Sequence, residues 1–279
     1  MKITGLYWSA TGNTKTLVNF LGKALAEALQ LPYTEVDFTP KSARERNYTF
    51  SSSDLLIVGA PTYAGKLPNK ILPDFQDRLK GDGTRTIALV TFGNRSFDNS
   101  LAELTYLLST NNFLPIGGAC FACRHAFSDK LAGGRPDEND LNEAKDFAER
   151  ILAKLTNTLS EDQQFSERMK KPILAVKGDP FAPYYIPKGK DGNPARFLKA
   201  KPKTNEDLCD NCGICATVCP MASISTENVS EINGICIKCQ ACVRSCPKGA
   251  KYFDDQAFLS HVAMLEENYC DRKENEFFL

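Results

Sequence analysis

The sequence predicts an α/β protein, with a doubly wound sheet of five parallel strands followed by a small, cysteine-rich α+β domain. Over residues 1–157, short apolar runs alternate with amphipathic segments, which is the pattern of a parallel sheet covered by helices on both faces. Eight of the eleven cysteines lie from Cys209 to Cys246. The length of 279 residues suits two domains, one large and one small.

The large domain is expected to contain strands joined by crossover helices. The apolar runs place strands at Ile3–Trp8, Tyr33–Phe38, Asp54–Ala60, Thr86–Phe92 and Phe113–Phe121. The amphipathic segments place helices at Thr14–Leu29, Pro68–Lys80, Asn99–Thr110 and Glu138–Leu155, and in the last of these the apolar residues recur at helical spacing. A doubly wound sheet binds its ligands at the carboxyl ends of its strands, so the loops that follow the strands form the candidate site.

The loop after the first strand predicts a phosphate site. It leads straight into a helix, so hydroxyls, an amide and backbone N–H groups gather at a helix N-terminus. Gly12 would allow the backbone to approach an anion closely. The loop lacks the motifs of nucleoside-triphosphate and dinucleotide sites, which favours a monophosphate; ordinary helix capping by the same residue types is the alternative. Its residues are Ser9, Ala10, Thr11, Gly12, Asn13 and Thr14.

Two further loops place aromatic residues at the same edge of the sheet. Tyr63 follows the third strand and Phe97 follows the fourth, so they are positioned to sandwich a flat ring whose phosphate tail lies on the first loop. Packing of each aromatic against its neighbouring helix is the alternative. The candidate residues of these two loops are Pro61, Thr62, Tyr63, Ala64 and Gly65, then Gly93, Asn94, Arg95, Phe97 and Asp98.

On these three loops, residues 1–157 resemble the flavodoxins, FMN-binding electron carriers with the strand order 2-1-3-4-5. The resemblance implies that four side chains hold the FMN phosphate: Ser9, Thr11, Asn13 and Thr14. It further implies that Tyr63 and Phe97 flank the isoalloxazine ring, and that backbone groups of residues 61–65 and 93–95 contact the polar edge of that ring. Phe97 departs from the flavodoxin pattern, because many flavodoxins have tyrosine there.

The cysteines form two copies of one spacing, with two residues between successive members of the first three, three residues before the fourth, and proline after it. The two copies are Cys209, Cys212, Cys215, Cys219 and Cys236, Cys239, Cys242, Cys246. This segment resembles the bacterial ferredoxins, which hold two 4Fe–4S clusters, the fourth cysteine of each run ligating the other cluster. The resemblance implies these two ligand sets: Cys209, Cys212, Cys215 and Cys246; and Cys236, Cys239, Cys242 and Cys219.

Zinc sites and disulfides are the alternatives for these cysteines. Zinc sites usually use two separated CxxC pairs for each metal rather than a run of four cysteines. Disulfides suit small secreted domains, and the N-terminus is too short in its apolar part for a secretory leader. The doubled spacing therefore favours iron–sulfur clusters.

The sequence divides into four parts. The flavodoxin-like domain (1–157) is followed by a connector at 158–203, which is rich in proline, Lys and Arg. The ferredoxin-like domain covers 204–255, and a C-terminal helix and tail cover 256–279, with the helix expected at Gln256–Tyr269. The connector is expected to lie over the flavin rim, to dock an acidic partner, or to be a solvated linker.

Few other residues suggest chemistry, and no catalytic residue is assigned. Cys120 and Cys123 form a CxxC at the end of the fifth strand, where a buried thiol pair is favoured over thioredoxin-like chemistry. Cys270 stands alone. Of the two histidines, His125 lies near the expected flavin edge and is the one candidate proton donor, whereas His261 belongs to no recognisable triad.

Composition limits the classes of binding partner and the cellular compartment that we expect for this protein. Lys plus Arg equals Asp plus Glu at 34 each, so the net charge indicates neither nucleic-acid binding nor attraction to a membrane. No apolar run approaches the roughly 18 residues of a spanning helix. Eleven cysteines without a leader indicate a reducing, cytoplasmic setting in which thiols bind metals. Homodimer formation is left open.

The whole chain resembles the clostridial-type fusions of a flavodoxin-like domain with a two-cluster ferredoxin, which implies a redox carrier or reductase. The preferred hypothesis is a carrier that passes electrons between two 4Fe–4S clusters and FMN and exchanges them with low-potential redox partner proteins. The alternatives are an FMN-dependent reductase of a small-molecule acceptor, supplied through the clusters, and a redox-sensing subunit. No nicotinamide site is visible, so direct use of NAD(P)H is not expected.

Overall fold

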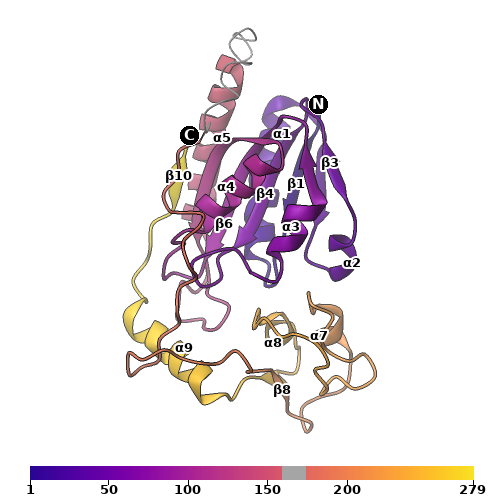
Figure 1. The fold of residues 1–279 in the computed structure, drawn as a ribbon, viewed down its shortest axis with the longest axis vertical. Coiled ribbons are helices and arrows are strands. Elements are labelled where there is room, and N and C mark those ends of the chain that lie inside the picture. Colours follow the sequence, from indigo (N-terminus) through magenta and orange to yellow (C-terminus); the bar gives the residue numbers. More distant parts are fainter. Residues whose placement is uncertain (159–173) are drawn as a thin grey trace.

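The computed structural model describes residues 1–158 and 174–279. A six-stranded sheet flanked by helices forms its larger part, and the cysteine-rich segment lies off the carboxyl ends of the parallel strands (Figure 1). The strands of the sheet are β1 (Ile3–Tyr7), β2 (Tyr33–Asp37), β4 (Leu55–Pro61), β6 (Thr84–Phe92), β7 (Phe113–Ala122) and β10 (Glu276–Phe278). The larger helices are α1 (Asn13–Leu29), α3 (Leu72–Arg78), α4 (Ser100–Thr110), α5 (Glu138–Thr158) and α9 (Gln256–Asn268).

The remaining elements are short. A two-stranded parallel sheet joins β3 to β5, and a two-stranded antiparallel sheet joins β8 to β9. Their bounds, with those of the short helices, are α2 (Lys41–Arg44), β3 (Tyr48–Phe50), β5 (Leu79–Gly81), β8 (Lys203–Thr204), α7 (Ile214–Thr217), α8 (Ala241–Arg244) and β9 (Lys251–Tyr252). No helix within the described residues is long and apolar enough to cross a membrane.

The five parallel strands pair in the order β2-β1-β4-β6-β7. Counted along the chain as strands of this sheet, the order is 2-1-3-4-5, in which the winding reverses beside β1. Side chains of α1 and α5 pack on one face of the sheet, and those of α3 and α4 pack on the other. The fold is therefore the doubly wound α/β class that the sequence predicts.

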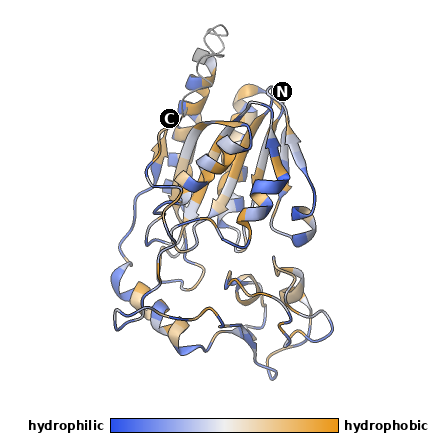
Figure 2. Ribbon diagram, viewed as in Figure 1, coloured by the Kyte–Doolittle hydropathy of each residue, from blue (hydrophilic) through white to orange (hydrophobic). Residues whose placement is uncertain are grey.

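The strands are apolar because both of their faces are covered. Along β4, Leu56 and Val58 face the core shared with α3 and α4, whereas Leu55 and Ile57 face the core shared with α1 and α5. This alternation follows from the two-residue period of a strand, and burial on both faces explains the continuous apolar run. The central strands are accordingly the most hydrophobic part of the ribbon (Figure 2).

The sheet contains a sixth strand in addition to the five parallel strands that the sequence predicts. The C-terminal segment returns to the sheet as β10, which pairs antiparallel with β7. Phe277 packs edge-on against Phe121, with 5.4 Å between ring centroids, and lies 5.2 Å from Phe147. The partner of this strand lies more than a hundred residues earlier, so no local pattern predicts the pairing. A second difference is that the helix expected at Pro68–Lys80 is shorter, because the chain enters β5 at its end.

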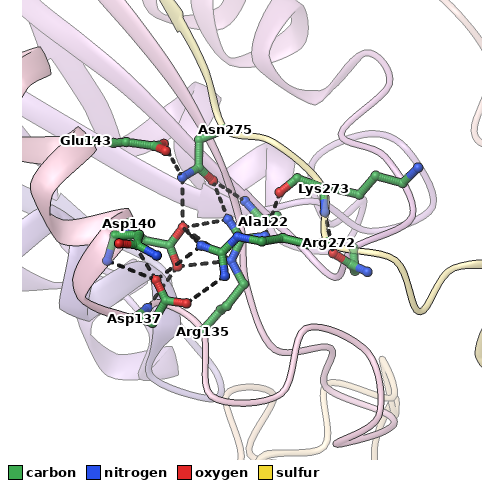
Figure 3. Close-up of polar contacts among 10 residues, drawn as sticks. Ala122, Arg135, Asp137, Asp140, Glu143, Arg272, Lys273 and Asn275 are labelled. Atoms are coloured by element: carbon green, nitrogen blue, oxygen red, sulfur yellow. Dashed lines mark hydrogen bonds and ion pairs between the residues drawn. The ribbon is translucent and has the colours of Figure 1, made fainter.

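A buried polar cluster fixes the segment between α9 and β10 to the start of α5 (Figure 3). Arg135 and Asp140 form an ion pair with side chains 4% and 0% exposed. Asn275 donates to Asp140 Oδ1 at 2.8 Å and accepts the backbone N–H of Ala122 at 2.9 Å, while Arg135 Nη1 donates to the Lys273 carbonyl at 2.6 Å. The cluster thereby ties the C-terminal segment to the end of β7.

This cluster predicts a stability difference between two ion pairs that both hold the C-terminal segment. Arg135→Leu leaves the buried carboxylate of Asp140 without its main partner, which should cost on the order of 3–5 kcal/mol. Lys130→Ala, the matched control, removes the exposed pair with Glu266 on α9 and should change stability little. Thermal unfolding measures both. Equal melting temperatures for the two variants would contradict a structural role for the buried cluster.

Candidate functional site

A cavity of about 230 Å³ lies at the carboxyl edge of the sheet. Its floor consists of the loops that follow β1, β4, β6 and β7, as expected for a doubly wound sheet. Three segments from later in the chain close it: the connector, the loop around Ile237 and Lys238, and helix α9. The lining residues from these segments are Tyr185, Pro187, Phe197, Ile237, Lys238, His261 and Leu265.

The first loop presents backbone N–H groups to this cavity. Gly12 adopts a left-handed conformation, with φ of 94°, and stands directly before α1. No hydrogen bond within the described residues engages the backbone N–H groups of residues 10–14. Unpaired N–H groups at the start of a 17-residue helix suit an anion. The loop residues that line the cavity are Ser9, Ala10, Thr11, Asn13 and Thr14.

Polar contacts hold three side chains of this loop in place. Ser9 Oγ accepts the Lys15 N–H at 3.1 Å, and Asn13 Nδ2 donates to the Arg124 carbonyl at 3.0 Å. The hydroxyls of Thr14 and Thr91 lie 2.8 Å apart. These contacts join the loop after β1 to strand β6 and to the loop after β7, so the loop is shaped in advance of any ligand.

The second loop lines the cavity as the sequence predicts. All five of its candidate residues, Pro61, Thr62, Tyr63, Ala64 and Gly65, contribute to the wall. The Tyr63 ring meets the Trp8 ring edge-on, with 5.8 Å between centroids. Burial, followed by the charges of Cys239 and Cys236, raises the pKa of Tyr63 above its usual range, so its phenol is neutral and serves as a flat apolar surface.

The third loop departs from the prediction. Gly93 and Arg95 line the cavity, but Phe97 does not; it is buried in the core, where its ring lies 5.7 Å from that of Phe92. The left-handed backbone at Asn94 and Asp98 bends the loop. The Phe97 ring therefore points into the core, although the residue follows the end of a strand. Phe97 therefore lies outside the wall of this cavity, whereas the sequence placed it at the cavity.

Asn94 and Asp98 also lie away from the cavity wall. Asn94 is fully buried and its amide donates to the Tyr269 and Asp271 carbonyls, at 2.6 and 2.9 Å. Asp98 pairs with Arg95. These two residues thus support the site indirectly, Asn94 by holding the segment after α9.

The connector supplies an aromatic residue that sequence reasoning missed. The guanidinium of Arg95 lies 4.0 Å from the centroid of the Tyr185 ring, and the Tyr185 N–H donates to the Ala64 carbonyl at 2.8 Å. Tyr185 thereby stands over the second and third loops. No periodic pattern in the connector distinguishes it from its neighbour Tyr184.

A buried cation fixes this part of the connector. Lys66 Nζ pairs with Glu103 at 3.0 Å, both side chains 8% exposed, and donates to the carbonyls of Pro180 and Ala182 at 2.8 and 3.0 Å. Such a paired and hydrogen-bonded charge holds its carbonyl partners firmly. The described part of the connector therefore lies over the cavity. Residues 159–173 of the expected connector lie outside the described residues.

The eight clustered cysteines surround two smaller cavities, each lined by four thiols from both runs. Cys209, Cys212, Cys215 and Cys246 line one, which we call the outer cysteine cavity. Cys219, Cys236, Cys239 and Cys242 line the other, which we call the inner cysteine cavity. Each set combines three cysteines of one run with the fourth of the other run. This is the grouping that the ferredoxin resemblance implies.

The chemistry of these two sites suits iron–sulfur clusters. Four thiols per site match the four ligands of a 4Fe–4S cluster. The Ser223 N–H donates to Cys219 Sγ at 3.4 Å and the Ala250 N–H donates to Cys246 Sγ at 3.3 Å, the same contact four residues after the last cysteine of each run. Burial raises the pKa of Cys239 and of Cys242 to about 12, so their thiolate forms need a bound metal centre for stability.

The inner cysteine cavity shares a wall with the large cavity. Ile237 and Lys238, which lie between Cys236 and Cys239, line both. Cys239 and Ala241 are buried in the same core as Trp8, with Tyr63 packed against it. By contrast, Cys212 of the outer cavity is exposed. The three cavities thus run in series from the sheet edge to solvent.

Two arginines hold the cysteine-rich segment in this position. Arg44, 4% exposed, pairs with Asp74 on α3 at 2.6 Å and donates to the Pro220 carbonyl at 2.7 Å. Arg244 donates to the carbonyls of Ala126 and His125, at 3.1 and 3.2 Å. One arginine thus fixes the end of the first cysteine run, and the other fixes the second run to the loop after β7.

The other three cysteines line neither cysteine cavity, although Cys123 contributes to the wall of the large cavity. Cys120 and Cys123 are both buried thiols, and burial raises the pKa of each well above its usual value. They lie in different cores, on opposite faces of the sheet, which separates the two sulfurs. Cys270 is exposed and its thiol donates to the Glu266 carbonyl at 2.9 Å.

Residues 208–251 match the family model of the 4Fe-4S dicluster domain. The chain therefore joins a flavodoxin-like fold to a 4Fe–4S dicluster domain. The dicluster domain contains both cysteine cavities, and the flavodoxin-like fold contains the floor of the large cavity. A curated relative, the uncharacterized protein MJ0749 of Methanocaldococcus jannaschii, is 39% identical over 59 residues, which cover 21% of this chain and 23% of that protein. The chain thus spans about a quarter of the curated relative it matches.

Solved structures similar to this one include flavodoxins. A flavodoxin from the domain Archaea is 15% identical over 56% of this chain and 99% of its own, with a TM-score of 0.37. Flavodoxin 2 of Bacillus cereus is 18% identical over 55% of this chain and 99% of its own, with a TM-score of 0.39. Rubredoxin oxygen:oxidoreductase of Desulfovibrio gigas is 16% identical over 57% of this chain and 37% of its own, with a TM-score of 0.35. The fold assignment rests on the strand order rather than on these scores.

The crossed grouping of cysteines predicts which substitutions affect the same cluster. Cys219→Ser and Cys242→Ser should abolish one and the same reduced-cluster EPR signal, although they lie in different runs, while Cys246→Ser should abolish the other. Cys270→Ser is the matched control and should leave both signals intact. If Cys219→Ser instead affected the same signal as Cys209→Ser, the grouping by cavity would be wrong.

Proposed function

We propose that this protein is an electron carrier in which two 4Fe–4S clusters of the dicluster domain exchange electrons with an FMN bound in the large cavity, and with low-potential redox partner proteins. Residues 1–157 hold the flavin in this proposal, and residues 204–255 hold the clusters. The observation that carries it is the wall that Ile237 and Lys238 share between the inner cysteine cavity and the large cavity. Two cofactor sites that share a wall suit electron transfer between them.

The first loop supports FMN as the flavin. Its free backbone N–H groups at the start of α1 suit a single phosphate, and the loop lacks the glycine pattern of a dinucleotide site. In this proposal, the N–H groups of residues 10–14 and the Thr11 hydroxyl bind the phosphate. Ser9, Asn13 and Thr14 position the loop through the contacts that they make with the protein.

The walls of the large cavity support binding of a flat ring. Tyr63 and Tyr185, which come from the second loop and the connector, supply aromatic surface. Lys238 and Arg95 add positive charge close to the ring site, which favours a reduced, anionic ligand. A flavin supplies one-electron and two-electron chemistry when bound, whereas each cluster supplies one electron at a time. The connector and α9 exclude water from the ring.

The exposure of the cysteines supports an order in which electrons pass through the sites. Cys212 is exposed at the outer cavity, whereas Cys239 is buried in the core that contains Trp8. The outer site is therefore accessible to a partner protein, and the inner site is accessible to the flavin cavity. Leu208 and Ile214, exposed near the outer thiols, give that surface an apolar component of the kind that redox partners contact.

Rapid mixing under anaerobic conditions tests this function. A reduced low-potential ferredoxin should bleach the flavin absorbance of the wild-type protein, and Cys212→Ala should slow that bleaching at least about tenfold, because the exposed cluster is the expected entry point. Cys270→Ala, which removes an exposed thiol outside both cysteine cavities, is the control and should match wild type. Unchanged flavin reduction in Cys212→Ala protein that has lost its outer cluster would contradict the proposal.

A further inference from the structure

The two histidines of the chain both line the large cavity. His125 follows β7, whereas His261 lies on α9, so the two come from opposite sides of the site. Both rings contact Phe127, with centroid separations of 4.8 Å for His125 and 6.5 Å for His261. The fold therefore brings together the only two imidazoles that the sequence contains.

Backbone contacts fix His125 as a hydrogen-bond donor toward the cavity. Its Nδ1 accepts the Phe127 N–H at 3.0 Å. A neutral imidazole that accepts at Nδ1 carries its proton on Nε2 and donates from there. The ring lies directly against Gly93, where a Cβ would collide with it. Gly93 belongs to the backbone segment expected to contact the polar edge of the flavin.

The opposite arrangement fixes His261 as an acceptor. Its Nδ1 lies 2.8 Å from the Lys188 carbonyl, and a carbonyl only accepts, so Nδ1 carries the proton and the neutral Nε2 accepts. The ring stacks on Phe197, with 5.4 Å between centroids and 27° between planes. That stacking and the Lys188 contact determine the orientation of the ring.

Both rings are neutral near pH 7. Burial, followed by the positive charges of neighbouring groups, lowers the pKa of His125 to about 3. Burial also lowers the pKa of His261, against the opposing effect of its contact with Lys188. No hydrogen bond to Nε2 of either ring occurs within the described residues. Each ring thus has one ring nitrogen available to a ligand.

We propose that His125 and His261 form a donor–acceptor pair that hydrogen-bonds the pyrimidine edge of the flavin. This inference rests on the proposed function. The edge of an oxidised flavin carries one N–H between two carbonyl groups, so it requires an acceptor beside a donor. A phosphate requires donors only, and the dimethylbenzene end of the flavin carries neither group. The pair accordingly matches the polar edge and neither of the other two ends of FMN.

Flavin binding to the cluster-loaded protein, from which the flavin has been removed, tests the pair. The readout is quenching of flavin fluorescence by FMN and by FMN methylated at N3, which lacks the N–H. Wild type should bind the methylated form about tenfold more weakly, the loss expected for one hydrogen bond to a partly buried acceptor. His261→Phe keeps the ring but lacks the acceptor, so it should bind both forms with equal affinity.

Substitutions of His125 test the donor of the pair separately. His125→Phe should weaken the binding of both FMN and the methylated form by about tenfold. His125→Gln should restore most of the affinity, because the amide N–H of glutamine reaches the position of Nε2. Phe258→Leu is the matched control: it disturbs the same aromatic cluster without removing a polar atom, and should keep the discrimination against the methylated form.

The outcomes separate this inference from the proposed function. Equal binding of both flavins by wild type, or discrimination that persists in His261→Phe, would overturn the pair while leaving an FMN site intact. Failure of wild type to bind FMN at all would overturn the proposed function and, with it, the pair.

Discussion

The arrangement of the sites depends on one feature of the packing: Cys239 and Ala241 of the dicluster domain are buried in the sheet's own core, which also contains Trp8. Because protein cores are close-packed, a thiol inserted there has a fixed position relative to the strand ends. The residues just before it, Ile237 and Lys238, then form the wall between the inner cysteine cavity and the large cavity. A dicluster domain on a free tether would have no such wall.

Three long-range contacts help to keep the large cavity closed. Lys66 holds the connector over the second loop, and Arg244 holds the loop after β7 to the second cysteine run. The polar cluster around Asp140 holds the segment that follows α9 (Figure 3). Each of these contacts joins parts of the chain that are distant in sequence, and each is a charged group with hydrogen-bonded partners, which makes it directional as well as strong. The contacts that close the large cavity therefore also hold the cysteine cavities in line with it.

The sequence predicted those features that local patterns encode. Apolar runs and helical periodicity located the five parallel strands, and the residue types before α1 located the loop whose backbone N–H groups are unpaired, because both signals lie within a few residues. Phe97 was misplaced because a loop's backbone conformation, here left-handed at Asp98, decides where a side chain points. Tyr185 and His261 were missed as cavity residues, since only tertiary packing brings the connector and α9 to the strand ends. Strand β10 was missed for the same reason.

Quantification of iron, sulfide and flavin in the anaerobically purified protein tests the central claim most directly, namely that two four-thiol sites adjoin one flavin site. The account predicts about eight iron atoms, about eight sulfides and about one FMN per chain. Zinc in place of iron, or iron–sulfur clusters without any flavin, would contradict it.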